Sequence, residues 1–310
     1  MDRALGIDIG GTKIACGLVH PDGTVDEVAT IPTAGTGQAV VDQVVALVDD
    51  YRSRHAPTAV GLVVPGGVDP RTGIVTAAAN LDWTDLDLAA ALRLPPSVTV
   101  HVDNDADAAA WAEHRFGGHP RGDSLVLITV GTGIGGGIVV DDRVVRGATG
   151  AGGEIGHLPL VPAGRPCECG SRGCWEQYAS GRALHRAAQA AGWPTGHAAL
   201  REALRGTTSA TEVVTEITTH LVHGITILTA VLDPAQVLLG GGLGTDPAFQ
   251  HFVHTAAAAT KPTKPRAQVP IRPATLGTHA GVIGAADLAR TATPRRGDRG
   301  ARRGGSRGGR

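Results

Sequence analysis

Apolar residues in the first 118 positions form short runs that are typical of buried strands, separated by segments with helical spacing. Pro21-Asp22-Gly23 places a turn between the second and third runs. Val41, Val44 and Val48 recur at the spacing of one helix face, which predicts a helix over 39–53. The elements predicted for this part of the chain are strands at 4–9, 12–19, 24–31, 58–64 and 97–102, and helices at 39–53 and 106–116.

The same pattern begins again at residue 124, where three more short apolar runs are followed by alternating helices and strands. A chain with two such groups is expected to fold into two similar α/β halves, with a ligand in the cleft between them. The elements predicted for this part are strands at 124–130, 136–140, 143–146, 236–239 and 269–275, and helices at 181–191, 196–204, 209–232, 247–259 and 280–291.

The composition indicates a globular protein and narrows the classes of partner. Hydrophobic residues make up 42% of the 310 residues and charged residues 18%, which argues against a disordered or fibrous chain. Seven arginines and one aspartate lie in 294–310, which has no apolar face and is predicted to be a disordered basic tail. Since the whole chain has a net charge of −1, residues 1–293 carry −7, so nucleic-acid binding is not expected.

Neither a membrane nor a secretory route is indicated by the sequence. No apolar run approaches the length of a membrane span, and the first residues lack the basic-then-apolar pattern of a secretory signal. The sequence therefore predicts a cytoplasmic protein with no membrane partner. In that compartment the four cysteines are expected to be thiols or metal ligands, and Cys16, inside a predicted strand, a buried core thiol.

The first candidate site is the turn at 8–13 (Asp-Ile-Gly-Gly-Thr-Lys) between the first two predicted strands. A diglycine turn lets backbone N–H groups approach an anion, while Thr12 adds a hydroxyl donor and Lys13 a cation. Asp8, at the strand end, is placed to hold a hydrated Mg²⁺ ion. The order of Lys and Thr, and the strand that follows, exclude a P-loop. An ordinary hairpin turn is the alternative interpretation.

A second glycine-rich turn lies at 131–137 (Gly-Thr-Gly-Ile-Gly-Gly-Gly). It contains G-x-G-x-x-G, but a strand follows where the dinucleotide-binding fold needs a helix. The pattern therefore favours a second phosphate-binding turn over a site for NAD. At equivalent places in two similar halves, the two turns are expected to face each other across the cleft and to hold a triphosphate from both sides.

A polar cluster, Asp103-Asn104-Asp105-Ala106-Asp107, joins a predicted strand to a predicted helix. Asn and Asp are favoured at helix N-caps, so a cap is one role for this cluster. A calcium loop is excluded because the glycine and the terminal bidentate acid are missing. One acid can cap the helix while another faces the cleft, which makes Asp105 the candidate general base. Asn104 is placed to orient a hydroxyl beside it.

Three cysteines and one histidine lie within 18 residues: His157, Cys167, Cys169 and Cys174. This set matches a structural Cys₃His zinc site. Four protein ligands leave no position for water, so the ion is predicted to be structural rather than catalytic. It would hold His157 in the cleft together with nearby Glu154 and Glu176. The alternative, three free cysteines on a loop, is disfavoured by their density.

The combination of these motifs resembles the ROK family (repressor, open reading frame, kinase). The family pattern G-H-x(9–11)-C-x-C-G-x(2)-G-C-x-E is matched in full from Gly156 to Glu176. The resemblance extends over about 4–291 and implies a two-lobed, actin-like and ribonuclease-H-like ATPase fold. It implies a small lobe of 1–118 plus 281–293, with the last helix packed on it, and a large lobe of 119–280 that contains the zinc loop at 157–176.

The resemblance also implies ATP and Mg²⁺ at the two glycine turns, with residues 240–242 near the adenosine. The residues implied to bind the nucleotide are Asp8, Gly10, Gly11, Thr12, Lys13, Gly131, Thr132, Gly133, Gly135, Gly241 and Gly242. The residues implied to contact a sugar are Gly66, Asn80, Asn104, Asp105, Glu154, His157 and Glu176, with one ring nitrogen of His157 on zinc and the other toward the sugar.

The activity implied by the resemblance is phosphorylation of a hexose at its 6-hydroxyl by ATP, with Asp105 as the proton acceptor. A carboxylate with an ordinary pKa is expected to suffice, because proton transfer is late when phosphoryl transfer is loose. Glucose is favoured because 65–69 and 80–83 resemble the glucose kinases of the family, although Asp82 replaces their usual proline. Kinases of N-acetylmannosamine, N-acetylglucosamine, fructose and allose share the same motifs and stay open.

Two interpretations belong to another class of protein. A sugar-responsive repressor needs an N-terminal helix-turn-helix, and the first predicted strand begins within five residues, so no DNA-binding domain is expected. A non-catalytic sugar sensor is disfavoured by the intact Asp8, Asp105 and glycine turns. The family resemblance implies a homodimer or a homotetramer.

Overall fold

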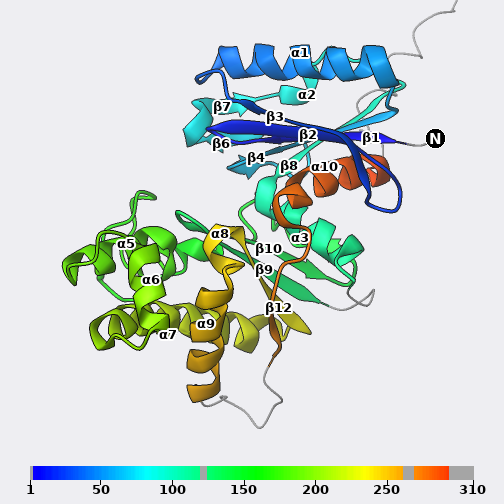
Figure 1. Cartoon of the computed structure of the whole chain (residues 1–310). Coiled ribbons are helices and arrows are strands. Elements are labelled where there is room, and N and C mark those ends of the chain that lie inside the picture. Colours follow the sequence, from blue (N-terminus) through cyan, green and yellow to red (C-terminus); the bar gives the residue numbers. More distant parts are fainter. Residues whose placement is uncertain (1–2, 119–123, 261–268, 293–310) are drawn as a thin grey trace, which may run out of the picture.

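The computed structural model describes residues 3–118, 124–260 and 269–292, which fold into two lobes (Figure 1). Each lobe is built on a five-stranded sheet, and in both sheets an antiparallel meander of three strands is extended by two parallel strands. The predicted α/β class and the repeated pattern are therefore confirmed. The predicted basic tail at 294–310 lies outside the described residues.

The first lobe has a sheet in the order β3-β2-β1-β4-β8. Leu5, Ile7 and Ile9 of its central strand β1 share one hydrophobic core with helix α1. The alternating residues Ala4 and Asp8 lie on the opposite face, which α10 covers. The elements are β1 (Ala4–Ile9), β2 (Lys13–Val19), β3 (Val25–Pro32), α1 (Gln38–His55), β4 (Ala59–Val64) and β8 (Thr99–Asn104).

A small antiparallel sheet between β4 and β8 was not predicted from the sequence. Its strands are two to four residues long, too short for an alternating pattern to stand out. The insert matters because Gly66 directly precedes its first strand and Asn80 lies between its second and third strands. Its elements are β5 (Gly67–Val68), β6 (Val75–Ala78), the 3₁₀ helix η1 (Ala79–Leu81) and β7 (Trp83–Leu86), followed by α2 (Leu88–Ala91).

The second lobe has a sheet in the order β11-β10-β9-β12-β13, and its helices form a separate layer against it (Figure 1). Its strands are β9 (Leu125–Val130), β10 (Ile134–Val140), β11 (Arg143–Val144), β12 (Gln236–Gly240) and β13 (Ile271–Pro273). Its helices are η2 (Ile155–His157), α4 (Glu176–Ala179), α5 (Gly181–Ala190), α6 (Gly196–Leu204), α7 (Thr208–Leu232), α8 (Gly241–Gly244) and α9 (Pro247–Ala259). Strand β13 is shorter than the predicted 269–275, and residues 261–268 before it lie outside the described residues.

Helix α7 corrects one statement made from the sequence. By length and composition alone this helix is long and apolar enough to cross a membrane. Half of its most apolar stretch is buried, however, and it packs against α4, α5, α6 and α9. This is the position of a core helix of the second lobe, and no other helix in the described part of the chain meets the same criteria.

Two helices, α3 (Asp105–Phe116) and α10 (Ala280–Thr291), lie between the lobes (Figure 1). Helix α10 packs on β1, β4 and α3, while α3 also packs on β9 and β10 of the second lobe. Glu113 of α3 accepts hydrogen bonds from the N–H groups of Thr275 and Leu276 and from the Thr275 hydroxyl, each at 2.8 Å. This buried carboxylate therefore fixes the path by which the chain returns, through η3 (Gly277–His279), to the first lobe.

Candidate functional site

A cavity of about 710 Å³ lies between the two lobes. It is lined by the β1–β2 turn, the β9–β10 turn, the start of α3 and the segment that leads into α10. The two glycine turns therefore meet at one cavity. The predicted site residues that line it are Asp8, Gly10, Lys13, Gly66, Asn80, Asn104, Asp105, Gly131, Gly133, Gly135, Glu154, His157, Glu176 and Gly241.

Four residues predicted to bind the nucleotide are not among the lining residues. Gly11, Thr12, Thr132 and Gly242 are exposed, and each is next in sequence to a lining residue. The β1–β2 turn is held in shape from outside, because the Thr33 hydroxyl donates to the Gly10 carbonyl at 2.6 Å and the Thr33 N–H to the Thr12 carbonyl at 3.0 Å. Thr33 was not among the residues predicted for the site.

Asn104 ends β8 and caps α3, which is the local arrangement predicted for the polar cluster. Its side-chain oxygen accepts hydrogen bonds from the N–H groups of Ala106 at 2.8 Å and Asp107 at 3.0 Å. Its side-chain nitrogen donates to the carbonyl of Gly66 at 3.0 Å. Asn104 is thereby fixed on both sides, and Asp105 follows it into the cavity as the first residue of α3.

Asp105 and Asp8 are recessed in the cavity, and their charges interact. Burial raises the pKa of Asp105 to about 7, and the nearby Asp8 carboxylate adds to the rise. Burial also raises the pKa of Asp8 to about 6, although the Lys13 ammonium opposes it. An ordinary pKa was expected to suffice for the proton acceptor, whereas the pKa of Asp105 lies above the ordinary range. The physical reason is first the burial of Asp105 in a low-dielectric cavity, and second the charge of Asp8, a carboxylate far away in the sequence that faces the same cavity.

The cysteine and histidine cluster forms as predicted. The ligand atoms of His157, Cys167, Cys169 and Cys174 all lie within 4.8 Å of one another. Cys169 Sγ and Cys174 Sγ are 3.6 Å apart, and Cys167 Sγ is 3.6 Å from His157 Nδ1. Zinc–sulfur bonds of about 2.3 Å in a tetrahedron put ligand atoms about 3.8 Å apart, so the donor set and its spacing fit a zinc ion.

Three of the residues predicted to contact the sugar, Glu154, His157 and Glu176, come together beside these cysteines. His157 turns Nδ1 toward the cysteines, and its Nε2 lies 4.0 Å from Glu154 Oε2. Glu176 Oε1 accepts a hydrogen bond from Cys167 Sγ at 3.2 Å and lies 3.9 Å from His157 Nδ1. Trp175 anchors this loop, because its buried indole donates to the His220 carbonyl of α7 at 2.9 Å.

The segment that enters α10 lines the cavity and was missed by the sequence analysis. The lining residues in question are Gly277, Thr278, His279, Ala280 and Gly281. A Cβ atom on Gly281 would lie 2.3 Å from Asp8 Oδ2, so only glycine lets the helix approach this carboxylate. The signal available in the sequence was Gly281, a glycine at the start of the predicted helix 280–291.

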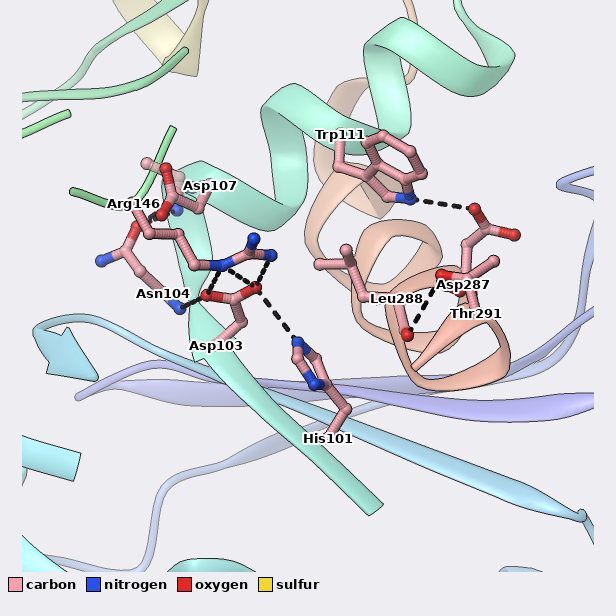
Figure 2. Close-up of polar contacts among 10 residues, drawn as sticks. His101, Asp103, Asn104, Asp107, Trp111, Arg146, Asp287, Leu288 and Thr291 are labelled. Carbon is pink, nitrogen blue, oxygen red and sulfur yellow. Dashed lines mark hydrogen bonds and ion pairs between the residues drawn. The ribbon is translucent and has the colours of Figure 1, made fainter. Parts of the chain in front are cut away.

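Behind Asn104, a buried polar group joins the lobes (Figure 2). Asp103 accepts hydrogen bonds from Arg146 Nε at 3.0 Å on both carboxylate oxygens, and His101 Nε2 lies 3.3 Å away. Although burial opposes it, hydrogen bonds from His101 and Arg146 hold the pKa of Asp103 below its ordinary value. Asp107 lies near this pair, and its Oδ1 has no hydrogen-bond partner within the described residues.

Asp107 makes the stability of the protein depend on pH. Burial raises the pKa of Asp107 to about 8, and the nearby Asp103 carboxylate adds to the rise. An acid whose pKa is higher in the folded state binds more protons there, so stability falls as pH rises toward that value.

Replacing Asp107 with asparagine is expected to raise Tm, because the neutral amide of the same shape needs no proton to be buried. The gain should grow between about pH 4, the ordinary pKa of an aspartate, and about pH 8, and then level off. Thermal melts of both proteins across this range measure it. A difference in Tm that stays constant with pH would contradict the assignment.

Comparison with known proteins places this site in a family. Residues 4–292 match the profile described as "ROK family". A glucokinase of Streptomyces coelicolor is 36% identical over 320 residues, which cover 95% of this chain and 99% of that protein. An N-acetylmannosamine kinase of Yersinia pseudotuberculosis is 32% identical over 298 residues, which cover 94% of this chain and 99% of that protein.

The fold agrees with this assignment. The crystal structure of a ROK family glucokinase from Streptomyces griseus, in complex with glucose and AMPPNP, matches this chain with a TM-score of 0.79 and 34% sequence identity. The match covers 94% of this chain and 100% of that one. With a family profile that spans both lobes, and relatives at 32–36% identity over nearly their whole length, the chain belongs to the ROK family.

Proposed function

We propose that the protein transfers the γ-phosphoryl group of ATP to the 6-hydroxyl of a hexose, and that glucose is the preferred hexose. The observation that carries this proposal is the meeting of Asp105 with both glycine turns in one cavity between the lobes. It is supported by the glucokinase of Streptomyces coelicolor and by the related glucokinase solved with glucose and AMPPNP.

Asp105 is the proposed proton acceptor. As the sugar 6-hydroxyl oxygen forms its bond to the γ-phosphorus, the bond from that phosphorus to the oxygen of the leaving ADP breaks. The hydroxyl proton passes to the Asp105 carboxylate. Lys13 and the backbone N–H groups of the two turns stabilise the charge on the phosphate oxygens. Approach of the lobes would exclude water and so limit ATP hydrolysis.

A magnesium ion is proposed in the same cavity. Asp8 and Asp105 both line the cavity and offer carboxylate oxygens, the ligands that Mg²⁺ prefers. Asp8 would hold the ion, which neutralises charge on the nucleotide phosphates when it is bound. Zinc is proposed at the Cys₃His cluster, with a structural role, because all four ligands come from the protein.

Kinases of other hexoses are the alternative within the same reaction, since an N-acetylmannosamine kinase is nearly as similar to this chain as the glucokinase. Release of ADP should be measured with Mg-ATP and zinc-loaded protein against glucose, mannose, fructose, allose, N-acetylglucosamine and N-acetylmannosamine. The highest kcat/KM is expected with glucose. A preference for an N-acetyl sugar would keep the mechanism and change the substrate, whereas no turnover with any of these sugars would overturn the proposed activity.

The proposed enzyme acts as a homodimer or homotetramer in the cytoplasm, as the family membership and the expected absence of nucleic-acid and membrane partners suggest. The mass of the purified protein in solution, measured by light scattering, tests the proposed oligomeric state.

A further inference from the structure

The ion pair between Arg146 and Asp103 connects the two lobes directly behind the proposed catalytic residue. Asp103 belongs to β8 of the first lobe, and its side chain is 3% exposed. Arg146 follows β11, the edge strand of the second lobe, and its side chain is 22% exposed. The guanidinium contacts both carboxylate oxygens, through Nε at 3.0 Å and through Nη2 (Figure 2). An ion pair this well buried and this well bonded holds its partners in one geometry.

Arg146 also begins the loop that carries Glu154. The Arg146 carbonyl accepts a hydrogen bond from the Gly152 N–H at 2.9 Å, which closes the 146–154 loop on itself. At its middle the loop touches the first lobe again, since a Cβ atom on Gly150 would lie 2.0 Å from the Val68 carbonyl oxygen. At its end the loop presents Glu154 to the cavity.

The same ion pair reaches the other side of the cavity through the backbone. Asp103 directly precedes Asn104, whose N–H donates to Asp103 Oδ1 at 3.0 Å, and Asn104 caps the helix that begins with Asp105. One arginine therefore joins the strand end that presents Asp105 to the loop that presents Glu154. Glu154 is close enough to Asp105 for their charges to interact.

We propose that Arg146 is a positioning residue of the sugar site, which sets Glu154 of the second lobe opposite Asn104 and Asp105 of the first. This inference rests on the proposed function, because it assigns Arg146 a role in placing the hexose between these groups. Arg146 does not line the cavity, so its effect on the reaction passes through Asp103 and the 146–154 loop.

The ion pair between Arg115 and Asp287, at the far end of α3, serves as the control. Asp287 of α10 accepts hydrogen bonds from Arg115 Nε at 3.1 Å, from Trp111 Nε1 at 2.9 Å (Figure 2) and from Arg290 Nη1 at 2.9 Å. The side chains of Arg115 and Asp287 are 21% and 1% exposed, almost the same as those of Arg146 and Asp103. The two ion pairs therefore have similar burial, but neither Arg115 nor Asp287 lines the cavity.

The variants to compare are Arg146→Gln, Arg146→Lys, Asp103→Asn, the Arg146→Gln/Asp103→Asn double variant, and Arg115→Gln. Arg146→Gln is expected to lower kcat/KM for glucose by about 10- to 100-fold, because displacing a reactant by about an ångström has effects of this size. The KM for glucose should rise while the KM for ATP stays near its wild-type value, since the hydrogen bonds of the Arg146 side chain within the described residues go to Asp103. The kcat/KM of Arg146→Lys for glucose should lie between the values of the wild type and of Arg146→Gln, because lysine keeps the charge but not the paired hydrogen bonds.

The Arg146→Gln/Asp103→Asn double variant should be at least as active as the less active of the two single variants, since both substitutions remove the same ion pair. Arg115→Gln should lower Tm and leave kcat/KM for glucose near that of the wild type. Amide hydrogen exchange gives a readout that is independent of turnover, with faster exchange expected in 103–107 and 146–154 for Arg146→Gln but not for Arg115→Gln.

Arg146→Gln with wild-type kcat/KM and an unchanged KM for glucose would overturn the positioning role. If the wild-type protein phosphorylated no hexose, the proposed function would fail, and the exchange experiment would still decide whether Arg146 holds the loop. If exchange in 146–154 were the same in Arg146→Gln as in the wild type, the inference that Arg146 positions this loop would be overturned independently of the proposed function.

Discussion

Replacing Asp105 with asparagine is expected to lower kcat with glucose by about 10²- to 10⁴-fold, because the amide cannot accept the proton of the 6-hydroxyl. Glucose should still bind, since Asn104, Glu154, His157 and Glu176 keep their positions around the cavity. Steady-state kinetics measure the loss, and calorimetric titration with glucose measures the binding that persists. Asn104 should continue to cap α3, so the substitution removes chemistry without removing the helix start.

The pH profile of the wild-type enzyme gives an independent test of the same assignment. Asp105 must be ionised to accept a proton, and its pKa in the free protein is raised to about 7 by burial and by Asp8. The value of kcat/KM should therefore rise with pH up to about 7 and then level off, since this ratio reports ionisations of the free enzyme. The residual kcat/KM of Asp105→Asn should not show this rise with pH.

Asp107→Asn is the matched control, because it makes the same change two residues along the same helix. Asp107 does not line the cavity and is mostly protonated at neutral pH, so its conversion to an amide should leave the pH profile of kcat/KM in place. Near-normal turnover by Asp105→Asn, or an identical loss in both variants, would defeat the assignment of Asp105 as the proton acceptor.

Removing one zinc ligand has the second large expected effect. Cys169→Ser should purify without zinc, lose nearly all kinase activity and unfold at a lower temperature. The reason is that metal binding contributes on the order of 10 kcal/mol to the folding of small structural zinc sites. His157 and Glu176 lie within 4 Å of each other beside the thiols, so loss of the ion should displace both.

Metal analysis of the purified proteins, expected to give about one zinc per wild-type chain, tests this directly. Cys16→Ser is the control, because Cys16 is a buried core thiol that donates to Tyr51 Oη at 3.4 Å and lies in the first lobe. It should retain zinc and activity. A Cys169→Ser protein that is metal-free and fully active would rule out the structural ion.

The parts of the site that the sequence predicted are those whose chemistry is local. The zinc ligands lie within one loop, and Asn104 and Asp105 mark a strand-to-helix junction that any helix cap would show. The repeated pattern of short apolar runs predicted the two halves, because each run is a strand with its own turn signals.

The parts that were missed depend on residues that are distant in the sequence. The pKa of Asp105 depends on Asp8, and the entry to α10 lines the cavity only because the last helix packs on the first strand. The pairing of Arg146 with Asp103 joins segments from different lobes. The short strands β5, β6 and β7 contain too few residues for a period to be read, so their sheet became visible only in the structure.

The position of α10 has a consequence for how the protein is made. This helix covers the face of β1 and β4 that carries Asp8, and it also contacts α3. While the chain is being synthesised, the first lobe therefore lacks its last layer until residues 280–291 have left the ribosome. By then the strands and helices of the second lobe have already emerged. All five strands of the first sheet emerge before those of the second, but the helix that covers this sheet comes last. We expect a nascent chain to complete its second lobe before its first, so the lobe that is synthesised first is the one that finishes folding last.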